Sequence, residues 1–409
     1  MNRDAHISPA ETVAHLRTTQ AIRQRAHYLR DLALRDDLAH FRYHPEALVP
    51  TAAYVCDLIN AQYPALDIPL HSRFRHFAAG GKDRLAETAL DAVAPRDRGR
   101  MLVELVVISV LLDAGAGDRW RYTESPDGRA YTRSEGLAVA SWQMYWRGLF
   151  SSCATPAVDA DRLAVLSLDE LARGFQVTTH NPLVGLAGRL QLLHNLSRLL
   201  RAKPDIFGAH GRLGFFYDYL ERLAAGDSLS AGHLVTAVLD VFSDICPARL
   251  CIDGMPLGDV WEHPALQTFA VAPGLMPLHK LSQWLAYSLI EAVAAGGIEV
   301  VDLEALTGLP EYRNGGLLID MGVLTPRLAG ALQRTYQVSD ALVVEWRALT
   351  VALLDELAGV IRQRLALDVT TLPLAKILEG GTWLAGRRLA FERRGGLSPV
   401  RIQSDGTVF

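Results

Sequence analysis

The chain has 409 residues, of which 50% are hydrophobic and 21% are charged, and its formal net charge is −4. This composition is typical of a globular protein and argues against a disordered or fibrous chain. The slight acidic excess argues against a dedicated nucleic-acid-binding protein, because such proteins usually carry a basic surplus.

Helical periodicity dominates the chain from its beginning, with apolar residues recurring every three or four positions. The predicted helices lie at residues 10–34, 49–62, 101–112, 183–200, 212–225, 232–242, 278–295, 339–365 and 374–394. The first residues lack an apolar signal core, and the apolar run at 101–112 is too short to span a bilayer. We therefore expect a soluble, cytoplasmic protein that does not engage a membrane.

Strands are predicted only at the C-terminal end. Residues 400–409 alternate around an Asp405-Gly406 turn, which is typical of a β-hairpin. Strands and helices do not alternate along the chain, so the sequence does not indicate a nucleotide-binding parallel sheet. We expect a mainly helical chain with a single domain over residues 1–409, and a weak break near Ala154 leaves two lobes, about 1–153 and 154–409, as the alternative.

The four cysteines do not form a metal-binding pattern. Cys56 and Cys153 stand alone, and no histidine or cysteine lies at zinc-ligand spacing from Cys246 and Cys251. We therefore expect no metal or other cofactor.

A basic cluster at residues 71–77 is the first feature with chemical potential. It contains His71, Arg73 and Arg75. Guanidinium groups pair bidentately with phosphate, so these side chains could bind an anion. A solvated basic turn is the alternative interpretation.

Two short glycine- and proline-containing segments border predicted helices. Asp113, Gly115 and Gly117 follow the helix at 101–112, where the glycines could form a C-cap or the turn of a helix-hairpin-helix. Thr179 or Asn181 is the expected N-cap of the helix at 183–200.

The helix at 278–295 begins with an unusual mixture of side chains. Lys280, Gln283 and Trp284 are spaced three and four residues apart, so they share one helix face. A lysine and a glutamine beside a tryptophan indicate the wall of a site more than a core stripe.

The segment at residues 306–316 carries the strongest polar signal. Glu311-Tyr312-Arg313-Asn314 follows Pro310 and precedes two glycines. Burying four such side chains is costly unless each finds a partner, and a bound polar ligand is one such partner. A loop whose side chains reach water is the alternative.

The same segments resemble a known family. In order along the chain, the matching blocks resemble the uracil catabolism protein 4 family, formerly a domain of unknown function. The resemblance implies a role in the uracil catabolic pathway, in which the pyrimidine ring is opened. The blocks cover residues 71–77, 112–122, 181–189, 277–289, 306–324, 380–390 and 404–409.

A second, more distant resemblance concerns two of these blocks. Residues 280–283 resemble the Lys-Arg-Ala-Gln block of the queuosine salvage proteins, which hydrolyse the N-glycosidic bond of queuosine 5′-phosphate. Leu306-Thr307 and residues 311–313 resemble their Leu-Thr and Asp-Tyr-Arg. Those enzymes are related to helix-hairpin-helix DNA glycosylases, so the resemblance implies a glycosylase-like helical fold. Glu311 departs from their catalytic aspartate, and residues 314–316 depart from the Pro-Gln that follows it.

Together the resemblances imply an N-ribosyl hydrolase. Its substrate would be a ribosylurea-type, 5′-phosphorylated intermediate, cleaved to urea and ribose phosphate. A carboxylate would stabilise the oxocarbenium-like transition state. Glu311 is the first choice for this role, and Asp320 and Asp113 are alternatives.

The remaining candidate residues would bind the small-molecule ribosylated substrate. They are Tyr312, Arg313, Asn314, Lys280, Gln283 and Trp284, with His71, Arg73 and Arg75 as further anion contacts. Two other functions stay open, an amidohydrolase acting on a ureido intermediate and a noncatalytic partner of the ring-opening enzyme. The sequence does not indicate the oligomeric state.

Overall fold

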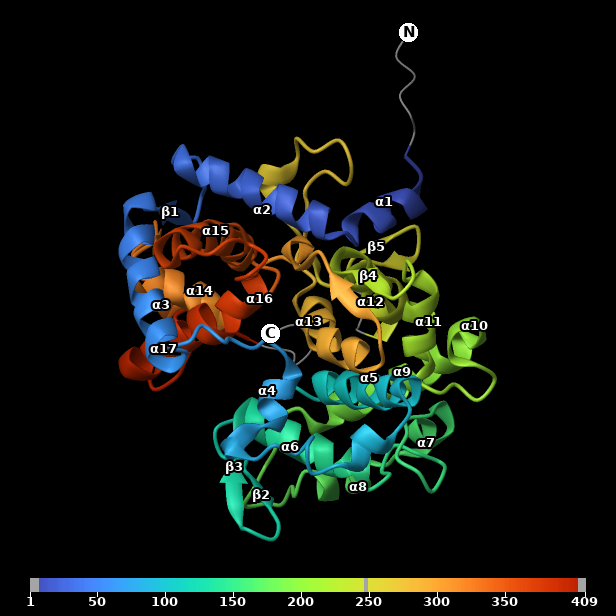
Figure 1. The fold of residues 1–409 in the computed structure, drawn as a ribbon. Coiled ribbons are helices and arrows are strands. Elements are labelled where there is room, and N and C mark those ends of the chain that lie inside the picture. The colour runs from blue at the N-terminus through green and yellow to red at the C-terminus, as the bar shows by residue number, and fades with distance from the viewer. Residues whose placement is uncertain (1–6, 246–248, 404–409) are drawn as a thin grey trace. The chain divides into compact units, whose positions relative to one another are not determined.

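The computed structural model describes residues 7–245 and 249–403, and it divides into two compact units (Figure 1). Unit 1 comprises Met1–His71, Ala248–Gln283 and Asp302–Phe409, and unit 2 comprises Ser72–Pro247 and Trp284–Val301. The break expected near Ala154 lies inside unit 2. The two units are therefore assembled from alternating parts of the chain.

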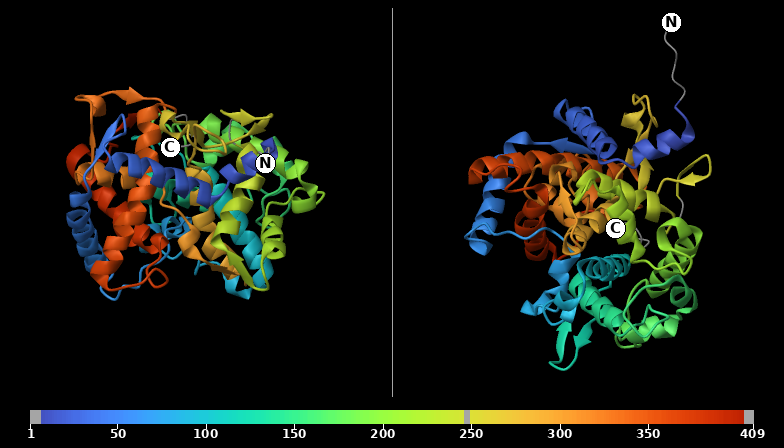
Figure 2. Two further views of the ribbon diagram at one scale, coloured as in Figure 1. Left: turned by 90° about the horizontal axis from the view of Figure 1, so that it is seen from above. Right: turned by 45° about the vertical axis from the view of Figure 1, so that its right-hand side comes forward.

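Unit 1 is organised around helix α15 (Ala341–Leu365), which is buried on most of its surface. A helix that is apolar all round is stable only when other elements cover it. Helices α2 (Thr19–Leu34) and α3 (Leu48–Gln62) pack against α15, and both views of Figure 2 show these helices together. The other helical elements are α1 (Pro9–Leu16), η1 (Pro45–Ala47), η5 (Pro264–Leu266), η6 (Leu303–Ala305), α14 (Tyr312–Asp320), η7 (Ala331–Gln333), α16 (Leu374–Ile377), η8 (Leu378–Thr382) and α17 (Trp383–Arg394).

Short strand pairs connect the helices of unit 1. The antiparallel pairs are β1 (Phe41–Tyr43) with β10 (Leu324–Pro326), β5 (Cys251–Ile252) with β6 (Met255–Pro256), and β7 (Val260–Glu262) with β8 (Leu275–Pro277). Near the C-terminus, β12 (Arg401–Ile402) pairs in parallel with β11 (Thr335–Tyr336). The Asp405-Gly406 turn of the expected hairpin lies outside the described residues.

Unit 2 is built around helix α5 (Pro95–Leu111), whose second half is almost entirely buried. Helices α4 (Arg73–Phe77), α6 (Arg133–Trp146), α9 (Leu186–Ala202) and α11 (Phe215–Leu223) pack against α5. The strand pairs are β2 (Tyr122–Glu124) with β3 (Arg129–Tyr131), antiparallel, and β4 (Ser228–Ser230) with β9 (Glu299–Val301), parallel. The remaining elements are η2 (Ala79–Gly81), η3 (Ala89–Ala92), α7 (Ala160–Val165), α8 (Leu168–Gly174), α10 (Pro204–Phe207), α12 (Ala231–Phe242) and η4 (Ser243–Ile245).

Of helix α13 (Lys280–Ala295), the residues up to Gln283 are assigned to unit 1 and those from Trp284 to unit 2. The mainly helical fold expected from the periodicity is confirmed. Within residues 7–245 and 249–403, no helix combines the length and apolar character that crossing a membrane requires.

Three local expectations are corrected by the structure. The helix expected at 10–34 is two helices, because Thr18 caps α2 by accepting a hydrogen bond from the Ala21 N–H. The expected helix at 183–200 starts later, at Leu186, after Gly185 adopts a left-handed φ of 73°. Asn181 is not its N-cap, since its side chain binds the backbone of Arg121 instead.

The turn at Gly115 and Gly117 does not join two consecutive helices. Helix α5 ends at Leu111, and the chain continues into β2. The side chain of Arg189 donates to the carbonyl groups of Leu112 and Ala114 and so holds this segment. The helix-hairpin-helix alternative for this turn is therefore wrong.

Candidate functional site

Glu311 lies at the N-cap of helix α14, in the polar segment singled out in the sequence. Its Oε2 accepts the Arg313 N–H at 2.9 Å and its Oε1 accepts the Asn314 N–H at 2.6 Å. The side chain is half-buried. A carboxylate oxygen has a second lone-pair direction, so these two bonds orient Glu311 and leave each oxygen able to accept another.

Arg313 stacks between aromatic rings in the first turn of α14. Its guanidinium carbon lies 4.2 Å from the Trp383 ring centroid and 5.4 Å from that of Tyr312. Its Nε donates to the Tyr312 hydroxyl at 3.1 Å. This arrangement fixes a planar cation beside two half-buried rings, which suits recognition of a phosphate or carboxylate group.

Close packing of α14 on α17 makes this stacking possible. A Cβ atom at Gly386 would lie 2.0 Å from the Arg313 carbonyl oxygen, so only glycine fits at this position of α17. The close approach brings the first turn of α14 against the start of α17, where Trp383 lies. The glycine is thus a packing requirement of the Arg313–Trp383 contact.

His71 joins the same cluster through a carboxylate that the sequence did not single out. Its Nδ1 lies 2.6 Å from Glu379 Oε2, and its ring centroid lies 5.8 Å from that of Trp383. Glu379 belongs to a π-helical turn, Leu378–Thr382. Such turns are rare and occur frequently at functional sites. Glycines inside an otherwise helical pattern, here Gly380 and Gly381, were the available signal.

Two buried polar atoms near this cluster have no hydrogen-bond partner within the part of the chain that the structure describes. They are Oδ1 of Asn314 and Oγ1 of Thr382, and both residues are fully buried. Leaving such an atom unpaired costs about 1–3 kcal/mol. A ligand or an ordered water that supplied a donor would remove this cost.

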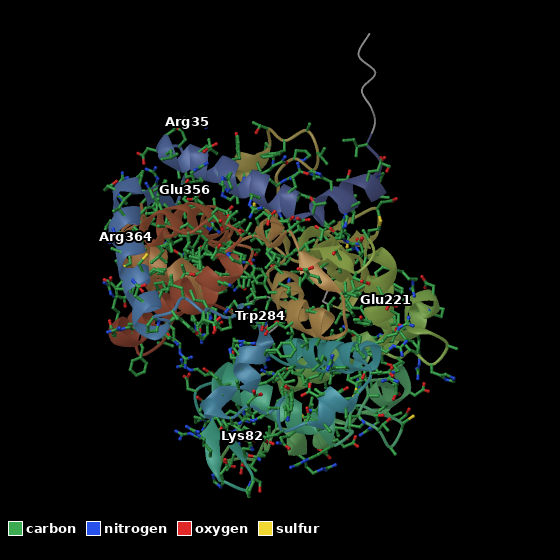
Figure 3. All side chains as sticks on the ribbon, viewed as in Figure 1. Arg35, Lys82, Glu221, Trp284, Glu356 and Arg364 are labelled. Atoms are coloured by element: carbon green, nitrogen blue, oxygen red, sulfur yellow. The ribbon has the colours of Figure 1, made fainter. Side chains whose placement is uncertain are left out.

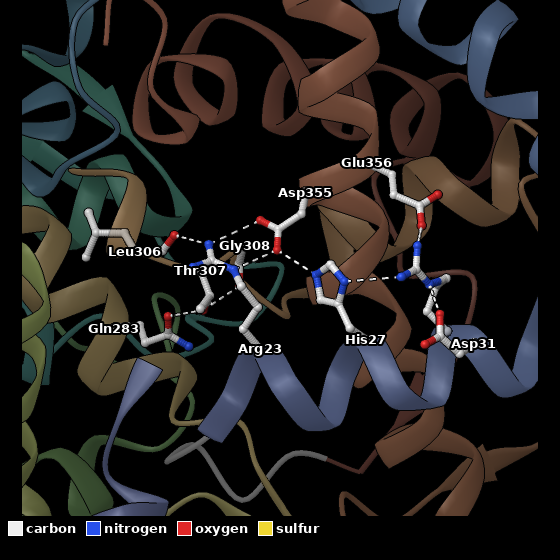
Figure 4. Close-up of polar contacts among 10 residues, drawn as sticks. Arg23, His27, Asp31, Gln283, Leu306, Thr307, Gly308, Asp355 and Glu356 are labelled. Carbon is white, nitrogen blue, oxygen red and sulfur yellow. Dashed lines mark hydrogen bonds and ion pairs between the residues drawn. The ribbon is translucent and has the colours of Figure 1, made fainter. Parts of the chain in front are cut away.

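The two blocks that resemble the queuosine salvage proteins meet in unit 1 (Figure 4). The Thr307 hydroxyl donates to Gln283 Oε1, and Gln283 Nε2 donates to the Leu278 carbonyl at 2.8 Å. Gln283 is fully buried, so it acts here as an internal connector.

Helix α2 holds the Leu306-Thr307 step from the other side (Figure 4). Arg23 donates through Nη2 to the Leu306 carbonyl at 2.7 Å and through Nε to Asp355 at 2.8 Å. His27 Nε2 lies 2.9 Å from the same carboxylate. One helical turn further along α2, Arg30 pairs with Glu356 of α15, which Figure 3 labels.

Trp284, Arg73 and Arg75 belong to unit 2, where they make internal contacts. Trp284 is buried and its ring centroid lies 6.0 Å from that of His76. Arg75 pairs with Glu291. Arg73 is fully buried, with Nη1 2.8 Å from Asp113 and Nε donating to Ser109, so the solvated-turn interpretation does not hold for Arg73.

The two alternative carboxylates are each engaged by an arginine. Both oxygens of Asp320 accept from Arg394, at 2.7 and 2.6 Å, and the Asp320 side chain is 3% exposed. Asp113 pairs with Arg73, whose pKa is lowered by burial, although the charge of Asp113 opposes that shift. Glu311 differs from both, because its recorded bonds are to backbone N–H groups.

Within the described residues, no group of three or more histidine, cysteine, aspartate or glutamate side chains is arranged to hold a metal ion. Cys56 is a buried free thiol, and Cys153 and Cys251 are exposed free thiols. Cys246 lies outside the described residues.

Comparison with known proteins gives near-complete matches. The family described as "Protein of unknown function (DUF1688)" matches residues 15–409. The chain is 38% identical over 419 residues to "Protein urg3" of Schizosaccharomyces pombe, which covers 98% of this chain and 99% of the relative. It is 36% identical over 443 residues to "Uracil catabolism protein 4" of Lachancea kluyveri, which covers 97% of this chain and 99% of the relative.

Proposed function

Because this chain belongs to the family described as Protein of unknown function (DUF1688), and one of its full-length relatives is named for uracil catabolism, we propose that it acts in that pathway as an N-ribosyl hydrolase. Its substrate is a ribosylurea, most simply the 5′-phosphate. Opening the ring of a uracil nucleotide leaves a ureido group on ribose phosphate, and releasing urea from that product requires cleavage of a C–N glycosidic bond.

The reaction adds water across that bond. The bond between the ribose anomeric carbon and the ureido nitrogen breaks, the water oxygen bonds to the carbon, and the nitrogen takes up a proton. The anomeric carbon becomes positively charged as the bond breaks. A carboxylate beneath it stabilises that charge and accepts a proton from the attacking water.

One observation carries the proposal, namely the direct contact between the two blocks that resemble an N-glycosidase family. The bond from Thr307 to Gln283 joins segments that are 24 residues apart. Near these joined segments, Glu311 is oriented by two N–H groups at the start of α14. We assign Glu311 as the carboxylate that lies beneath the anomeric carbon and accepts a proton from the attacking water.

The other assignments follow the chemistry of each group. Arg313, stacked on Trp383, binds the phosphate. Tyr312, Asn314 and Lys280 bind ribose hydroxyls, and a ribose hydroxyl donating to Asn314 Oδ1 would satisfy that buried acceptor. Gln283 acts through Thr307 rather than through the substrate.

The test is a product analysis of the purified protein with ribosylurea 5-phosphate in ¹⁸O-labelled water. We expect urea and ribose 5-phosphate in equal amounts, with one ¹⁸O at the anomeric position after correction for exchange of the free sugar. Release of ammonia in place of urea would support the amidohydrolase alternative. No turnover of this substrate, alone or with the ring-opening enzyme added, would contradict the proposal and leave the noncatalytic partner.

A further inference from the structure

A buried ion pair contacts the starts of helices α13 and α14 in unit 1. Arg347 of α15 donates from Nη1 and Nη2 to the two oxygens of Asp259, at 2.9 and 2.7 Å. The side chains are 1% and 9% exposed. The Trp261 indole N–H also donates to Asp259. Burial raises the pKa of Asp259, but the charge and hydrogen bonds of Arg347 outweigh it and lower this pKa to about 2.

The same pair reaches both segments through their backbones. Asp259 Oδ2 accepts the Lys280 N–H at 2.9 Å, and the Asp259 carbonyl accepts the Leu278 and His279 N–H groups, at 2.9 and 3.2 Å. On the other side, Arg347 Nε lies 3.4 Å from the Pro310 carbonyl, one residue before Glu311. Two side chains thus connect the start of α13 with the start of α14.

The backbone at the start of α13 is held in an unfavourable conformation. His279 has a φ of 46°, in the left-handed region that costs a non-glycine residue about 1–2 kcal/mol. Its N–H bond to Asp259 and the 3.0 Å contact of its Nε2 with the Leu16 carbonyl hold it there. Such a conformation persists only where its surroundings over-determine it, and it aims the first turn of α13.

A purely stabilising role does not explain the pair well. Replacing a buried ion pair with apolar side chains is often neutral or stabilising, because the charges pay a large desolvation cost. Geometry is the property that an apolar replacement would lose. An error of about 1 Å in the position of a reacting group can reduce turnover about 100-fold.

We propose that Arg347 and Asp259 are positioning residues, which set the first turn of α13 and the first turn of α14 in register for the reaction. This inference rests on the proposed function for its catalytic consequence. The structural part, a shared dependence of both segments on one ion pair, stands independently of the substrate.

The experiment uses the full-length chain with three substitutions, Arg347→Met, Arg347→Lys and Arg394→Met. Arg394→Met is the matched control, because Arg394 makes an equivalent bidentate pair with Asp320 at the far end of α14. Amide hydrogen exchange is measured for residues 278–283 and 311–314. Melting temperature, kcat and KM for urea release are measured on the same samples.

For Arg347→Met we expect faster exchange in both segments and a kcat about 10- to 100-fold lower. Arg347→Lys keeps the charge but cannot bridge Asp259 and Pro310 together, so we expect a melting temperature nearer the parent with kcat still about 10-fold lower. This variant decides the matter if Arg347→Met does not fold. For Arg394→Met we expect a lower melting temperature with kcat within about twofold of the parent.

Equal effects of Arg347→Met and Arg394→Met on kcat would overturn the inference. Unchanged exchange at residues 278–283 in the Arg347 variants would also overturn it. If the parent releases no urea, the proposed function fails, whereas the exchange data still decide whether the ion pair couples the two segments.

Discussion

The starts of helices α13 and α14 differ in the side chain that accepts their first backbone N–H groups. Each must satisfy backbone N–H groups that have no partner inside the helix. At α13 the acceptor comes from elsewhere in the chain, since the buried Asp259 accepts the Lys280 N–H and is neutralised by Arg347. At α14 the acceptor is the N-cap residue Glu311, which is half-buried and accepts two N–H groups of the first turn.

This difference separates a carboxylate that is used by the scaffold from the carboxylate to which we assign the proposed reaction. The Asp259 oxygens accept hydrogen bonds from Arg347, Trp261 and Lys280, which leaves Asp259 little capacity to meet a substrate. Glu311 keeps accessible surface and stands beside Tyr312 and the stacked Arg313. A buried, neutralised carboxylate holds geometry, and a half-buried one beside cationic and aromatic groups can do chemistry.

Glu311→Gln is expected to have the largest effect, and it tests whether Glu311 takes part in the reaction. Glutamine keeps a carbonyl oxygen for one of the two α14 N–H groups but loses the acceptor for the other, so we expect a loss of stability of about 1 kcal/mol. The negative charge is lost, and we expect kcat for urea release to fall about 10²- to 10⁴-fold. Steady-state urea release measures the effect.

Glu304→Gln is the matched control, because Glu304 is exposed in the same unit and we expect parent activity from it. Glu311→Asp tests the departure from the queuosine salvage proteins at this position. A Glu311→Gln protein as fast as the parent would remove Glu311 from the mechanism.

Asp320→Asn tests whether the other end of α14 is only structural. Removing the charge leaves Arg394 without its bidentate partner, and we expect a loss of about 2 kcal/mol, because Asp320 is buried while Arg394 is partly exposed. Guanidinium chloride unfolding measures the loss. Activity per folded molecule should stay within about twofold, and a loss comparable to that of Glu311→Gln would reassign the catalytic carboxylate.

Glu379→Gln tests whether the His71 cluster extends the site from α14. A carboxylate on Nδ1 fixes the orientation and tautomer of an imidazole, so we expect about a 10-fold fall in kcat/KM when it becomes an amide. Glu46→Gln is the control, since Glu46 pairs with His44 at 3.4 Å on the surface. Parent-like kinetics for Glu379→Gln would restrict the site to the α14 side.

The start of α13 should carry a pH signature in stability. Burial lowers the pKa of His279 to about 4 from an ordinary value of 6.5. Between these two values the unfolded chain binds a proton that the folded chain does not, so stability is full above pH 6.5 and falls as pH drops toward 4. The slope from this group is at most about 1.4 kcal/mol per pH unit.

Denaturant unfolding at pH 7, 6, 5 and 4 measures this slope. His279→Asn should flatten it, because asparagine tolerates the left-handed conformation and does not titrate. The same slope in the variant and the parent would assign the pH dependence to other groups.

The local features of this protein were predictable because they depend on neighbours along the chain. Periodicity of 3.6 residues located most helices, including the buried α5 and α15. The polar run at Glu311–Asn314 was visible in the sequence, because burying four such side chains has a free-energy cost unless each finds a partner. Helix ends were less predictable, since the break at Thr18 and the late start after Gly185 depend on single capping groups.

Partners distant in the chain were not predictable. His71 and Glu379 are 308 residues apart, and Asp259 and Arg347 are 88 apart. No periodicity links such residues, because their meeting depends on how α15, α14 and α17 pack. For the π-helical turn that carries Glu379, Gly380 and Gly381 were the available signal, and they did not indicate that Glu379 contacts His71.

By itself, the sequence determined the helical class and located the polar and charged residue types available for a site, because secondary structure and side-chain chemistry are local properties. Only the tertiary structure decided which of these residues are scaffold and which remain accessible. Gln283, Arg73 and Asp320 are enclosed with their partners, whereas Glu311 and Tyr312 keep exposed surface. The physical reason is burial, since an enclosed charge must be neutralised by a neighbour and is then no longer available for chemistry.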